Sequence, residues 1–130
     1  MLKINNNEYK VLSSEVKYVD ATYNKLKGYS ILVTLDIELN NIKGYISFYV
    51  DFFCVKDFKN IENRKYVELP TELDSKIKMI EIFDTINFID FIDSKVNLEF
   101  GIINNNHIKM NLSINDDLIK LEYQGLLNVK

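Results

Sequence analysis

The stretch that decides the fold is residues 29–54, which read YSILVTLDIELNNIKGYISFYVDFFC. From 29 to 39 the odd positions are apolar and the even ones mostly polar, whereas after 41 most even positions are apolar. This alternation has the period of a β-strand. A two-residue turn at Asn40-Asn41 would place both apolar sets on one face of a hairpin, with Leu35 opposite Ile46 and Val33 opposite Phe48.

The same alternation recurs at both ends of the chain. It predicts further hairpins with turns at Asn6-Asn7, at 104–106 and at Asn115-Asp116. A break in phase near Ser13 predicts a bulge or corner there. The predicted cross-strand pairs are Ile4 with Tyr9, Leu2 with Val11, Ile102 with Ile108, Phe100 with Met110, Leu98 with Leu112, Leu112 with Ile119, Met110 with Leu121, Lys109 with Glu122 and Glu38 with Lys43.

Residues 71–95 fit two periods. The β-branched run at 77–83 favours a strand, and a stripe of apolar residues from Ile86 to Ile92 fits a short helix capped by Asp84. The sequence therefore predicts one mainly β domain over residues 1–130, α+β by strict count. We expect an antiparallel β-sandwich or partly closed barrel of about eight strands built from Asn-turn hairpins, with one short helix near residues 85–93.

Charge and composition limit the partners. The chain has 130 residues, a net charge of −3, fifteen lysines and one arginine, Arg64. The acidic balance disfavours nucleic acid, and no apolar run approaches the length of a membrane helix. The single cysteine, Cys54, suits a reducing cytoplasm. The abundance of Lys, Asn and Ile is typical of AT-rich coding DNA, as in a bacterium or phage.

Catalytic and metal-binding patterns are weak. The only histidine, His107, lies beside a predicted turn, and Cys54 is expected on the apolar face as a small core residue. Asp90 and Asp93 would share the polar face of the predicted helix. Zinc and calcium both need ligand spacings that this sequence lacks. We therefore expect no catalytic residues, no metal and no cofactor, and we expect that the protein is not an enzyme.

The least ordinary feature is the second face of the strand at 42–55. It carries Tyr45, Tyr49, Asp51 and Phe53, where a half-buried strand should be mostly polar. Across the hairpin, Leu32 would face Tyr49, and Asp36 would face Tyr45. Three readings remain open. The strand is covered on both faces, the stripe is an exposed patch for a protein partner, or the aromatics line a ligand cavity.

These observations favour a small non-catalytic cytoplasmic protein-binding or assembly module that acts through a sheet face or an edge strand. Its partner would be another protein or a second copy of itself. The candidate binding residues are Tyr45, Tyr49, Phe53, Leu32, Asp36 and Asp51. The alternative is a β-barrel that binds a small apolar ligand in its interior.

Overall fold

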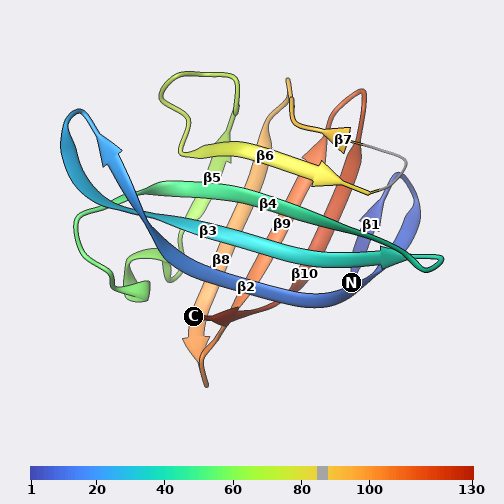
Figure 1. Cartoon of the computed structure of the whole chain (residues 1–130), viewed down its shortest axis with the longest axis horizontal. Helices are drawn as coiled ribbons and strands as arrows, with labels where there is room; N and C mark the ends of the chain where they lie inside the picture. Colours follow the sequence, from blue (N-terminus) through green and yellow to red (C-terminus); the bar gives the residue numbers. More distant parts are fainter. Residues whose placement is uncertain (85–87) are drawn as a thin grey trace.

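The protein is described by a computed structural model that covers residues 1–84 and 88–130 (Figure 1). Its elements are mostly strands with one short 3-10 helix. They are β1 (Leu2–Ile4), β2 (Asn7–Tyr23), β3 (Leu26–Leu39), β4 (Ile42–Phe53), η1 (Phe58–Ile61), β5 (Lys65–Glu68), β6 (Ile77–Phe83), β7 (Phe88–Ile89), β8 (Val96–Asn104), β9 (His107–Asn115) and β10 (Lys120–Val129).

The strands form one ten-stranded sheet in the order β5-β8-β9-β10-β1-β2-β3-β4-β6-β7. Neighbours in this order pair antiparallel, and the end of β10 adds a short parallel contact to β2. The predicted mainly β, antiparallel fold is confirmed, with ten described strands rather than about eight. Because β5 and β7 remain as edges, the sheet is open and does not close into a barrel.

The sheet folds over on itself into two layers. In Figure 1, β2, β3, β4 and β6 run side by side across the front, and β5, β8, β9 and β10 cross behind them at a steep angle. The bend lies at β1 and β2, where β2 pairs with β1 near its start and with β10 at Val16. A register shift between Val11 and Ser13 confirms the predicted bulge. The core between the layers is aliphatic and aromatic, and Phe48 and Phe100 are its largest fully buried side chains.

Asparagine in the left-handed backbone region makes the turns. Asn40 and Asn41 have φ of 52° and 66°, as a type I′ hairpin turn requires. The predicted β3–β4 register is confirmed, with Leu35 opposite Ile46 and Val33 opposite Phe48. The predicted neighbours Glu38 and Lys43 also face each other. The pair Asn24-Lys25 forms another such turn between β2 and β3.

Two predicted registers are wrong by an even number of residues. The first turn is at Asn5-Asn6, so Leu2 faces Tyr9 rather than Val11. In the last hairpin a longer connection, closed by a hydrogen bond from Asp116 N to Ile119 O, places Leu112 opposite Tyr123. Lys109 accordingly faces Leu126 instead of Glu122. An even slip leaves every side chain on its original face, so the apolar alternation does not detect it.

In the third hairpin, Phe100 faces Met110 and Leu98 faces Leu112, as predicted. The turn is Asn105-Asn106, and a register shift between Phe100 and Ile103 absorbs the extra residue. Ile103 therefore replaces Ile102 opposite Ile108, and Ile102 is exposed.

The predicted strand at 77–83 is confirmed as β6, but the helix predicted near residues 85–93 is wrong over its described part. Phe88 and Ile89 form β7, which pairs with Phe83 and Ile82, and residues 90–95 are irregular. Residues 85–87 lie outside the described part of the chain. The apolar stripe does not face the core as a unit, because Ile92 is buried while Phe88 and Phe91 are exposed. Phe88 and Ile89 pair with the edge of β6 instead of packing on the core as part of a helix.

Candidate functional site on the outer face of β4

The central strand β4 presents aromatic side chains on the outer face of the front layer. Tyr45 and Tyr49 are both half-buried there. On β3, Asp36 lies opposite Tyr45 and Leu32 opposite Tyr49, as predicted. These four candidate residues therefore share one face, flanked by β3 on one side and β6 on the other.

Asp51 ends this shared face. Its φ of 57° accompanies a register shift in the β3–β4 pairing, so the strand beyond it changes faces. Phe53 therefore points into the core, 9% exposed, with its ring 6.0 Å from that of Tyr18. The prediction that Phe53 continues the stripe is wrong. Cys54, predicted to be buried, is exposed for the same reason.

The Asp51 side chain is held by internal partners. Its Oδ2 accepts a hydrogen bond of 3.0 Å from the Tyr66 hydroxyl, and its Oδ1 accepts a hydrogen bond of 2.7 Å from Phe52 N. Lys76 Nζ lies 3.7 Å from the same Oδ1. These contacts fix the bulge, so Asp51 serves the strand geometry rather than the outer aromatic face.

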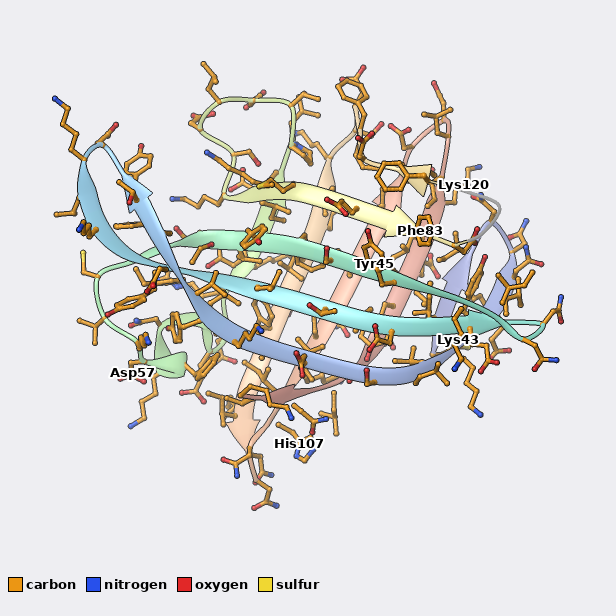
Figure 2. The ribbon with its side chains drawn as sticks, in the orientation of Figure 1. Lys43, Tyr45, Asp57, Phe83, His107 and Lys120 are labelled. Carbon is orange, nitrogen blue, oxygen red and sulfur yellow. The ribbon has the colours of Figure 1, made fainter. Side chains whose placement is uncertain are left out.

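An aromatic row, defined as Tyr45, Phe83 and Phe88, crosses from β4 to the sheet edge. The Tyr45 and Phe83 rings stack with centroids 5.5 Å apart, and Phe88 meets Phe83 edge-on at 6.0 Å. Figure 2 shows Tyr45 on β4 beside Phe83 at the end of β6. Phe88 is 56% exposed at the outer end of the row. The row therefore presents apolar ring surface to solvent.

Acidic groups lie along the aromatic row. The Tyr45 hydroxyl donates a 2.8 Å hydrogen bond to Glu81 Oε2, and this bond is the main cause that raises the Tyr45 pKa. Asp36 faces Tyr45 across the ladder, and Asp84 directly follows Phe83. Asp84 Oδ2 accepts a 2.9 Å hydrogen bond from the Tyr9 hydroxyl. Asp36 and Glu81 thus flank the Tyr45 ring on the outer face, whereas Asp84 is bound to Tyr9, a core residue.

Gly44 allows β6 to pass close to β4 at this site. A Cβ placed on Gly44 would lie 2.0 Å from Phe83 O and 3.0 Å from Asp84 Cα. Both contacts are with backbone atoms, which cannot rotate away as a side chain would. Glycine inside a strand often marks such a close approach of another backbone. This approach sets the position of Phe83 beside Tyr45.

A hollow lies on the outer face of the front layer, at the end of β4 away from the aromatic row. Tyr23, Tyr49 and Phe52 line it together with Lys76 and Lys78, and its volume is about 310 Å³. The Tyr23 and Phe52 rings lie 5.8 Å apart. Several of its polar groups already have internal partners. For example, Lys78 Nζ donates to Leu73 O, and Lys76 pairs with Asp51.

The edge of the sheet beside the aromatic row is protected. Ser75 Oγ accepts a hydrogen bond from Ile77 N and donates one to Ile77 O, so both backbone groups of that residue are occupied. Met79 has a φ of 56°, which interrupts the regular strand, and β7 covers Ile82 and Phe83. Bulges and side-chain caps of this kind discourage edge-to-edge pairing. The face, rather than the edge, is the more accessible binding surface.

The largest pKa shifts in the protein belong to buried tyrosines. Burial, reinforced by the hydrogen bond to Asp84, raises the pKa of Tyr9 to about 12. Burial also raises the pKa of Tyr66, whose hydroxyl bonds Asp51, and those of Tyr18 and Tyr123. None of these groups titrates near neutral pH, so their effect is on stability in alkali.

We expect the free energy of unfolding to fall as the pH rises from about 10 to about 12. Unfolded tyrosines lose their protons near pH 10, whereas the folded protein keeps the Tyr9 proton to about 12. The folded state then binds more protons, so its stability decreases with pH over this interval and is unaffected below it. Urea titrations across the interval should show this slope, and Tyr9→Phe should reduce it. A slope that is equal in both proteins would contradict the assignment.

The residues considered for catalysis are not brought together. His107 Nδ1 lies 2.7 Å from Asn105 O in the β8–β9 turn, and Figure 2 places His107 far from Phe83. Asp90 and Asp93 are exposed on irregular chain rather than on one helix face, which corrects that prediction. Among residues 1–84 and 88–130, no group of three His, Cys, Asp or Glu side chains is placed to hold a metal ion.

Phe83 and Phe88 were missed as site residues from the sequence. Phe83 ends the predicted strand and Phe88 lies in the predicted helix, and only the β6–β7 pairing brings their rings together.

No helix in the described part of the chain is long and apolar enough to span a bilayer. Comparison with known proteins gives no match to any family model, curated sequence or solved structure.

Proposed function

We propose that this chain is a non-catalytic binding module that docks a protein partner on the aromatic row. The observation that carries the proposal is the exposed end of the row, where Phe88 extends a stack of rings from β4 to the surface. Aromatic side chains in such clusters supply much of the binding energy in protein interfaces. A rigid row of rings on paired strands loses little entropy on binding.

The surrounding charge favours a partner with lysine or arginine beside an apolar anchor. Asp36 and Glu81 lie next to the Tyr45 ring, and Asp90 follows β7. Carboxylates that flank an apolar surface attract basic groups and steer their approach. An arginine could also stack on an exposed ring face. Self-association of this acidic chain through the same face would bring like charges together, so we propose a different protein as the partner.

The other candidate, a closed barrel around an apolar ligand, loses its premise because the sheet is open. We also propose a cytoplasmic location, which the lone exposed thiol of Cys54 supports, since a reducing compartment keeps such a thiol free.

The test is a quantitative comparison of variants against the partner. Affinity capture from the native organism would identify the candidate, and calorimetry with the two purified proteins would measure Kd. We expect Phe88→Ala to weaken binding by about tenfold or more, because the most exposed ring of the row is removed. The complex should also weaken with rising salt.

Ile102→Ala is the matched control, because Ile102 is similarly exposed but belongs to β8 in the other layer. It should bind like the wild type. Equal affinities for all three proteins would contradict the proposal. A concentration-dependent dimer that Phe88→Ala dissolves would replace it with self-association.

A further inference from the structure

A separate hollow of about 450 Å³ lies on the outer face of the back layer. It is lined by outward side chains of β1, β5, β8, β9 and β10, the strands drawn behind the front layer in Figure 1. Asn111 on β9 is central, with Glu99 of β8 opposite it on one side and Gln124 of β10 on the other. The volume falls within the range of about 300–1,000 Å³ that small-molecule sites occupy.

Asn111 has an unsatisfied acceptor. Its Oδ1 is buried and has no hydrogen-bond partner within the described residues. Such an atom costs about 1–3 kcal/mol of stability relative to a hydrogen-bonded one. The missing partner must be a donor, which a hydroxyl or an N–H supplies and a fully ionised phosphate or carboxylate does not.

The charges of the lysine and glutamate side chains around Asn111 cancel. Lys65 faces Glu99 across β5 and β8, and Lys3 faces Glu122 across β1 and β10. Yet the one ion pair in the part of the chain that the structure describes joins Lys76 and Asp51. These four groups also make no side-chain hydrogen bond there. They therefore remain available to a ligand, and their four charges sum to zero. The one further charge at the hollow, the Met1 ammonium, already donates a 2.7 Å hydrogen bond to Gln124 O.

The remaining polar groups donate and accept in equal measure. Asn97, Ser113 and Gln124 line the hollow with carboxamides and a hydroxyl, none of which bonds a described residue through its side chain. A carboxamide offers both donors and an acceptor, and a hydroxyl offers both. The complement to such a set is a molecule with several hydroxyls, each of which also donates and accepts.

From these contacts we propose that the hollow binds a neutral polyhydroxylated ligand, a saccharide unit, with a hydroxyl donating to Asn111 Oδ1. This site is on the other layer from the aromatic row and does not depend on the protein-docking function. The unit could be a free sugar or the end of a longer glycan, because both present the same hydroxyls.

The experiment is ¹H–¹⁵N chemical-shift titration with glucose, galactose, N-acetylglucosamine, cellobiose and chitobiose, each into the millimolar range. We expect at least one sugar to produce saturable shifts confined to Asn97, Glu99, Asn111, Ser113 and Gln124. A monosaccharide that binds identifies a free-sugar site, and binding of a disaccharide alone identifies a glycan end. Asn111→Ala should weaken the interaction about tenfold, and Gln124→Ala serves the same purpose if the first variant misfolds.

Asn128→Ala is the control, because Asn128 is an exposed asparagine on β10 that does not line the hollow. It should titrate like the wild type. The proposal is overturned if no sugar gives saturable shifts, if the shifts survive both Asn111→Ala and Gln124→Ala unchanged, or if inorganic phosphate binds the hollow instead.

Discussion

Replacing Gly44 with alanine should destabilise the protein by about 3 kcal/mol or more. The new Cβ would lie 2.0 Å from the carbonyl oxygen of Phe83, so β6 would have to move away from β4. This movement would also separate Phe83 from Tyr45 and disturb the aromatic row. Urea denaturation measures the stability loss, and calorimetry with the partner should show weaker binding even where the variant stays folded.

Gly101→Ala is the comparison for this experiment. Its Cβ would meet Lys109 Cβ at 3.2 Å, which needs only a small adjustment. Removing glycine also stiffens the unfolded chain, which offsets part of the cost. We expect a change within about 1 kcal/mol. If the two alanine variants proved equally stable, the close approach of β6 to Gly44 would be refuted.

Phe48→Ala should cost about 3–5 kcal/mol, the usual range for a fully buried phenylalanine. Phe48 is 1% exposed and lies on the inner face of β4, opposite Val33. Its loss would leave a cavity between the two layers. Thermal and urea unfolding should both register a loss that is a large part of the total stability of a domain this size.

Ile102→Ala provides the contrast, because this side chain is 63% exposed at the β8 bulge. Its effect should stay within about 0.5 kcal/mol. A small loss for Phe48→Ala, similar to that for Ile102→Ala, would mean that the inner face of β4 is not the packed one and that the assignment of faces is reversed.

The sequence predicted the faces of the strands better than their registers. The β3–β4 hairpin could be predicted from its turn as far as Val50 because Asn40-Asn41 leaves one turn position that matches both apolar sets. At Asn5-Asn6-Asn7 two turn positions give the same faces, so the alternation could not choose between Tyr9 and Val11 as the partner of Leu2.

The candidate site was predictable in part. Tyr45, Tyr49, Leu32 and Asp36 follow from the hairpin register alone, and the structure places them on one face. The departure of Phe53 depends on a bulge at Asp51, a residue type that tolerates positive φ but does not demand it. The partners Phe83 and Phe88 depend on the pairing of β6 with β4 and on the pairing of β7 with β6 in place of the predicted helix, and a local period does not encode these pairings.

The most direct test of the docking proposal is site-specific photo-crosslinking in the native organism. Benzoylphenylalanine would replace Phe88 in one strain and the similarly exposed Ile102 in another. We predict that position 88 cross-links to one defined protein, through a peptide containing lysine or arginine, and that position 102 does not. Absence of any cross-link at 88, or the same products from both positions, would contradict the assignment of the aromatic row as the binding surface.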